Sequence, residues 1–241
     1  MARLFLFIFL LFALHLTSAQ NRYKYPVLPP TGPKIESFVP KGWHIVEKAE
    51  GDLNKDNAPD IAAVVEADKD VPNLKEEDYP QKPRILLIAL RQANGSYTLS
   101  IQSNESILLS NEGGVMGDPL AGLTIERGTL LVQFYGGSAD RWGYDYRWRF
   151  QNNEWFLIGA TATFSTMSAN QFNTYDFNLS TGAAEHTSGA FLEEENKKNT
   201  PEKKRSFNIG KKPLLKLRTF KPITTLIYKD VYILKGAISH F

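Results

Sequence analysis

The sequence predicts an all-β protein built from antiparallel sheets of successive hairpins, arranged as a sandwich or a meander. Three observations predict this class. Short runs rich in β-branched and aromatic residues recur along the chain, glycine or small polar turns separate them, and no run beyond the N-terminus shows helical periodicity. The chain has 241 residues and no cysteine, so packing rather than disulfide bonds has to hold this fold.

The first 19 residues have the pattern of a secretory signal peptide. Arg3 gives a positive start, residues 4–16 form an apolar run, and Thr17-Ser18-Ala19 supplies small residues before a cleavage site. The apolar run is shorter than the about 20 residues that a membrane-spanning helix needs. We therefore expect cleavage after Ala19, a periplasmic or secreted location, and no transmembrane anchor on the mature chain.

Composition divides the rest of the chain into four segments. Residues 20–41 contain five prolines and are expected to form an extended leader, because proline fixes φ and lacks an N–H donor. Residues 42–192 are expected to form the β-rich domain. Residues 193–212 are rich in charge and poor in apolar side chains, which predicts a linker. Residues 213–241 are apolar again, and we expect a C-terminal strand segment there.

Candidate strands within the β-rich domain are short and separated by turn signals. They comprise residues 43–49, 61–66, 85–92, 96–102, 107–110, 123–126, 130–135, 144–151, 155–163, 173–178 and 182–187. Four hairpin turns are expected between neighbouring candidates. These turns are Ala93-Asn94-Gly95, Arg127-Gly128, Asn152-Asn153 and Ser180-Thr181. Each such turn predicts that the two flanking strands pair in an antiparallel manner.

The loop between the first two candidate strands is acidic. Residues 52–60 read Asp-Leu-Asn-Lys-Asp-Asn-Ala-Pro-Asp, and oxygen-bearing side chains recur at loop positions 1, 3, 5 and 9. They belong to Asp52, Asn54, Asp56 and Asp60. With the backbone carbonyl of Ala58 at position 7, this spacing suits Ca²⁺, which takes six to eight oxygen ligands. The alternative is a turn in which the aspartates accept backbone N–H groups without a metal.

Residues 51–61 resemble the calcium-binding loop of FG-GAP and VCBS repeats, which occurs in integrin-type β-propellers. The resemblance implies a loop between two strands that holds a structural Ca²⁺. Asn57 occupies the position where that family usually has glycine, and asparagine tolerates the left-handed conformation. The motif occurs once and no internal period is found, so a full propeller is not expected. The order of segments also resembles exported bacterial proteins, which implies no particular activity.

Residues 140–150 alternate between aromatic and charged side chains. The even-numbered positions include the aromatic residues Trp142, Tyr144, Tyr146, Trp148 and Phe150. The odd-numbered positions include the charged residues Arg141, Asp145, Arg147 and Arg149. On a strand the two sets point to opposite faces. We expect the aromatic face to be core and the charged face to be solvated. The alternative is an aromatic platform for sugars or an arginine face for anionic ligands.

The composition and motifs favour binding over catalysis. The 28 Lys and Arg residues nearly balance 26 Asp and Glu residues, so no nucleic-acid partner is expected. Ser138 lacks the Gly-x-Ser-x-Gly pattern of a nucleophile elbow, and we identify no catalytic residue. We expect an exported, calcium-stabilised binding or interaction protein of the cell envelope, with a protein or glycan ligand. The alternative is a secreted hydrolase or a carbohydrate-active accessory protein.

Overall fold

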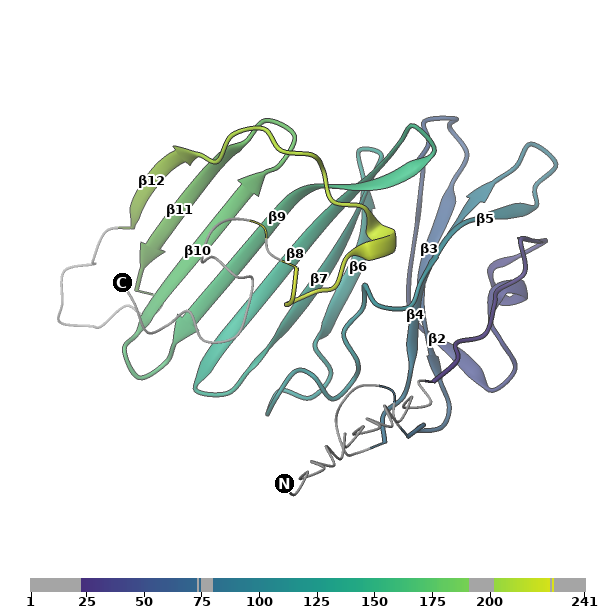
Figure 1. Ribbon diagram of the computed structural model, residues 1–241, viewed down its shortest axis with the longest axis horizontal. Helices are drawn as coiled ribbons and strands as arrows, with labels where there is room; N and C mark the ends of the chain where they lie inside the picture. The colour runs from purple at the N-terminus through teal and green to yellow at the C-terminus, as the bar shows by residue number, and fades with distance from the viewer. Residues whose placement is uncertain (1–22, 73, 75–79, 191–201, 226, 228–241) are drawn as a thin grey trace, which may run out of the picture.

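The protein consists of two antiparallel sheets, which form neither a closed barrel nor a propeller (Figure 1). This confirms the all-β, antiparallel fold that the sequence predicts. The computed structural model describes residues 23–72, 74, 80–190, 202–225 and 227. The expected signal peptide, residues 1–19, lies outside the described residues. Two short 3₁₀ turns, η1 (Ile35–Phe38) and η2 (Leu217–Thr219), accompany the sheets.

The smaller sheet has five strands in the order β1-β5-β4-β3-β2. The strands are β1 (Thr31–Gly32), β2 (Trp43–Gly51), β3 (Asp60–Ala67), β4 (Arg84–Arg91) and β5 (Tyr97–Ser103). Strands β2 to β5 pair in chain order. The leader adds β1 at the far edge, where Thr31 pairs with Thr98.

The larger sheet has seven strands in the order β12-β11-β10-β9-β8-β7-β6, which is a simple meander. The strands are β6 (Leu120–Glu126), β7 (Thr129–Gly137), β8 (Asp140–Gln151), β9 (Glu154–Thr166), β10 (Gln171–Asn178), β11 (Ala183–Gly189) and β12 (Lys203–Asn208). The two sheets meet where β2 lies against β6.

All four expected hairpins are present. In two of them, the backbone conformation explains why the turn residues predict a hairpin. Arg127 and Gly128 have φ values of 52° and 73°, and Asn152 and Asn153 have φ values of 51° and 56°. A two-residue hairpin turn with positive φ at both positions matches the twist of the strands that it joins. Glycine and asparagine reach this region at low cost, which favours them at such turns.

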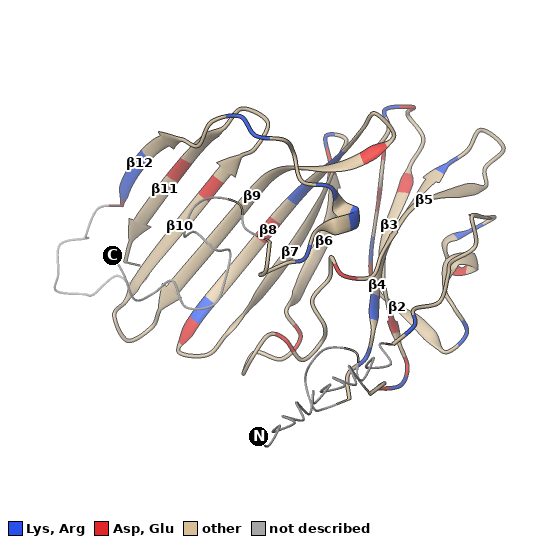
Figure 2. Cartoon of the chain, in the orientation of Figure 1, with Lys and Arg blue, Asp and Glu red and all other residues tan. Residues whose placement is uncertain are grey.

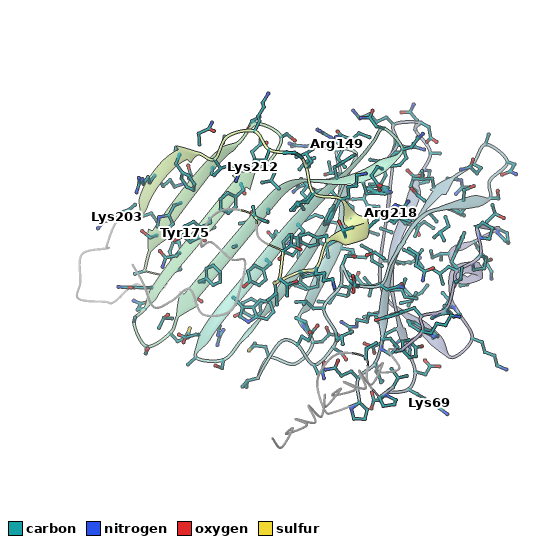
Figure 3. All side chains as sticks on the ribbon, in the orientation of Figure 1. Lys69, Arg149, Tyr175, Lys203, Lys212 and Arg218 are labelled. Carbon is teal, nitrogen blue, oxygen red and sulfur yellow. The ribbon has the colours of Figure 1, made fainter. Side chains whose placement is uncertain are left out.

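One core lies between the two sheets. The aromatic side chains of β8 point into this core, and Tyr144, Tyr146 and Trp148 are at most 2% exposed. The ring of Phe220, beside η2, packs edge-to-face on Tyr146 and Trp148. The expectation of an aromatic core face is confirmed, and the sugar platform on that face is not supported. Figure 3 shows the side chains crowded where the sheets meet.

A second core covers the opposite face of the small sheet. Alternate residues of β3 and β4 face this way, and Leu28, Ile35 and Phe38 of the leader pack against them. The Gln102 side chain fastens the leader, because its amide nitrogen donates to the Pro26 carbonyl and its amide oxygen accepts the Leu28 N–H. Strand β3 is therefore buried along its whole length, between the leader and the large sheet.

One expectation for the C-terminal part is corrected, and a second lies partly outside the described residues. Lys203–Asn208, inside the range expected to be a linker, is strand β12, which pairs with β11. No described residue of the range 213–241 belongs to a strand. Residues 213–225 cross back over the large sheet, where η2 contacts β5 and β9 (Figure 1). Residues 226 and 228–241 lie outside the described residues. Apolar side chains such as Leu217 and Phe220 fill the space between the sheets, and among the described residues the backbone pairs with β9 at one isolated bridge, between Lys216 and Phe156.

Candidate calcium-binding loop

The acidic loop connects β2 to β3 at the corner where the two sheets meet. Gly51 and Asp60 are register partners at its base, and Leu53, 1% exposed, inserts into the shared core. A Cβ on Gly128, in the β6–β7 turn, would lie 3.9 Å from the carbonyl oxygen of Asp52. The loop thus touches a turn of the large sheet while belonging to the small one.

The backbone of the loop curls through two left-handed residues. Lys55 has a φ of 69° and Asn57 a φ of 65°. Asparagine visits this region more readily than most residues because its short polar side chain can hydrogen-bond locally. The sixth loop position therefore lies in the left-handed region, which glycine reaches most readily.

Three polar side chains of the loop accept hydrogen bonds from its own backbone. Asp52 accepts the N–H groups of Lys55 at 2.6 Å and Asn57 at 3.0 Å. Asp56 accepts the N–H of Ala58 at 2.8 Å, and Asn54 accepts the N–H of Asp56 at 3.0 Å. The N–H of Ala58 and the side chain of Asn54 lower the pKa of Asp56. These contacts favour the ionised form of Asp56 and pre-arrange the loop.

Asp60 differs from the other loop carboxylates because it is fully buried. Its two oxygens accept the backbone N–H groups of Leu53 and Arg91, both at 2.8 Å. Burial raises its pKa, and the two backbone hydrogen bonds oppose that shift without overcoming it. Asp60 therefore ties the loop to the end of β4. The spacing of the oxygen-bearing residues predicts Asp60 as a metal ligand. It does not indicate this anchoring contact.

The oxygen atoms on the exposed side of the loop are of the kinds that calcium takes as ligands. A carboxylate oxygen has two lone pairs, so Asp52 and Asp56 keep acceptor capacity beyond their N–H contacts. Asn54 and the Ala58 carbonyl would complete the protein ligands, with water at the remaining positions. Over the described residues, no group of three or more His, Cys, Asp or Glu side chains is arranged to hold a metal. Such a site would consequently depend on amide and backbone oxygens.

A buried ion network, at the end of β3 opposite to the loop, was not anticipated from the sequence. Arg84 of β4, 1% exposed, donates from Nε to Glu66 of β3 at 2.7 Å and from Nη1 to Asp118 at 2.8 Å. It also donates to the carbonyl of Leu108 at 3.2 Å. The network joins two strands of the small sheet to the segment that enters β6. A single arginine in an apolar run was the available signal, since such a charge needs partners when buried.

Comparisons with protein-family models, with curated proteins and with solved structures return no match to this chain. In the described part of the chain, no helix is long and apolar enough to cross a membrane. The functional interpretation therefore rests on the geometry of the loop, the network and the sheet faces.

Proposed function

We propose that this chain is an exported, calcium-stabilised β-rich binding protein of the cell envelope. The observation that carries the proposal is the acidic loop, which presents Asp52, Asn54 and Asp56 at the junction of the two sheets. An ion held there would fix the β2–β3 connection against the β6–β7 turn. Millimolar Ca²⁺ outside the cytosol matches the affinity range of extracellular calcium modules, about 10⁻⁴–10⁻³ M.

Calcium is expected to raise the melting temperature of the mature protein by about 4–7 °C. A dissociation constant of about 10⁻⁴ M and about 2 mM Ca²⁺ stabilise the folded state by about 1.8 kcal/mol through linkage. Each kcal/mol shifts the melting temperature of a chain of this size by about 2–4 °C. Differential scanning calorimetry with Ca²⁺ and with a chelator measures the shift, and isothermal titration measures the binding heat.

Matched variants assign the effect to the loop. Asp56→Ala should abolish the calcium-dependent shift, because it removes a charged ligand that is exposed at the loop surface. Asp70→Ala removes an exposed carboxylate outside the loop and should leave the shift intact. The calcium assignment would be rejected if chelator-treated protein gave no heat with several millimolar Ca²⁺, or if both variants responded like the parent.

Export predicts a defined mature N-terminus. Expression of the full chain in a bacterial host should yield a periplasmic or secreted product that begins at Gln20, since signal peptidase cleaves after small residues such as Ala19. Intact-mass measurement of the fractionated product checks this. Recovery of the whole product with Met1 or Ala2 at its N-terminus would contradict it.

A further inference from the structure

A hollow of about 300 Å³ opens on the face of the large sheet that points away from the core. Gly143 of β8 forms its floor. Tyr135 of β7 and Thr163 of β9 are the cross-strand partners of Gly143, so they stand on either side of it. Arg141 and Asp145, two residues before and after on β8, close the ends. The hollow exists because glycine contributes no side chain where these four neighbours do.

The polar groups around the hollow are held in position by one another. Arg141 donates from Nη1 to the Tyr135 hydroxyl at 2.9 Å, and Gln133 donates from Nε2 to Asp145 Oδ1 at 3.2 Å. The Nε of Arg141 is buried and meets no hydrogen-bond acceptor among the described residues. Tyr135 is 39% exposed, which is high for a large aromatic side chain. The walls of the hollow therefore combine the accessible ring of Tyr135 with hydrogen-bond donors and acceptors that are held in position.

We propose that this hollow binds one ring of a neutral sugar, which deepens the proposed binding function and rests on it. Hydroxyl groups both donate and accept, so a sugar can give a hydrogen bond to Asp145 and take one from Arg141. The apolar face of a sugar ring can lie on the ring of Tyr135, whose body is apolar and whose tip is polar. The volume lies at the lower end of the range for small-molecule pockets.

The charge arrangement favours a neutral sugar over a charged ligand. Arg141 and Asp145 have opposite charges, so the hollow has no net attraction for an anion or a cation. Their Cα atoms are four residues apart on one strand, which is about 13 Å. The ammonium and carboxylate groups of a free amino acid share one carbon, whereas the hydroxyls of a sugar ring point in several directions and can each donate or accept.

The structure also provides a variant that closes the hollow without harming the fold. A Cβ on Gly143 would meet its nearest atom, the Phe134 carbonyl oxygen, at 3.6 Å, which is ordinary contact, and its φ is not left-handed. Gly143→Thr therefore fills the hollow with a residue that strands favour. Gly159→Thr is the matched control. It lies on the same sheet face beside Arg147, outside the hollow, and its nearest contact would be 3.6 Å.

The test is a titration of the ¹⁵N-labelled mature protein with glucose, galactose, mannose and N-acetylglucosamine, followed by NMR. At least one sugar should shift the amide signals of Tyr135 and Gly143 saturably, with a Kd on the order of 1 mM, as expected for a ligand of this size. Gly143→Thr should weaken that binding at least tenfold. Gly159→Thr should leave it unchanged, and both should melt at or above the parent temperature.

Several results would overturn the proposal. They are the lack of a saturable shift with every sugar, equal binding by Gly143→Thr and the parent, or saturation by phosphate or glutamate in place of sugars. Repeating the titration with Ca²⁺ and with a chelator separates this proposal from the calcium proposal. Sugar binding without a calcium response rejects the loop site alone, and a calcium response without sugar binding rejects the hollow alone.

Discussion

Replacement of Arg84 by methionine is expected to lower the free energy of unfolding by about 3–5 kcal/mol. The guanidinium is the buried partner of Glu66, which is itself only 6% exposed. Without it, the Glu66 carboxylate remains in the interior with no compensating cation. The Leu108 carbonyl and Asp118 also lose their contacts with Nη1. Chemical denaturation of parent and variant measures the difference.

Arg218→Met is the matched control, because it removes an arginine whose side chain is 56% exposed. Its ion pair with Glu154 is expected to contribute at most about 1 kcal/mol. A double variant, Arg84→Met with Glu66→Leu, should recover much of the loss, since apolar side chains can replace a buried ion pair. A loss below about 1 kcal/mol for Arg84→Met would refute the role of the network.

The same network makes part of the stability dependent on pH. Burial acts to raise the pKa of Asp118, but hydrogen bonds from Arg84 and Leu120 and the charge of Arg84 outweigh it, so the pKa lies below the ordinary 3.8. A lowered folded-state pKa contributes stability above the unfolded-state pKa, and this contribution is lost as the pH falls through the folded-state pKa. Arg84→Met should flatten this acid-dependent loss, which pH-dependent denaturation would detect.

Asp60→Ala is expected to destabilise the protein by about 2–4 kcal/mol, with or without calcium. The substitution leaves the buried N–H of Leu53 and the partly buried N–H of Arg91 without their acceptor, and each unsatisfied buried donor costs about 1–3 kcal/mol. Denaturation in chelator measures the metal-independent cost. Hydrogen exchange should also quicken at these two amides.

Asp56→Ala provides the comparison within the same loop. Asp56 is exposed, so its removal should change the stability in chelator much less than removal of Asp60. If Asp60→Ala destabilised the protein only when Ca²⁺ was present, Asp60 would act as a calcium ligand. The anchoring role would then be wrong.

The turns and alternating runs allowed the fold class to be predicted because their chemistry is local. Asn152-Asn153 and Arg127-Gly128 specify hairpins through backbone conformation alone. Strand β12 could not be predicted, because a solvent-exposed edge strand needs no apolar pattern. Most residues of Lys203–Asn208 are exposed. Residues 213–225 are apolar without forming a strand, because apolar side chains indicate burial and do not distinguish a strand from an irregular segment between two sheets.

The sites were predictable only in part. Spacing identified the acidic loop, but oxygen spacing is the same for a metal ligand and for a buried acceptor, so the role of Asp60 required the position of Arg91 on β4. The hollow could not be foreseen from residues 140–150. Gly143 stands out only when the register places Tyr135 and Thr163 beside it, and that register depends on pairing between separate strands.

Strand β12 ends the large sheet with a basic edge, where Lys203, Lys204 and Arg205 follow one another (Figure 2). Within the described residues it pairs with β11 alone, so it is an edge strand of the sheet. Consecutive cations oppose the docking of a second copy there by electrostatic repulsion. Such an edge disfavours the strand-to-strand association by which β-rich chains extend their sheets into fibrils.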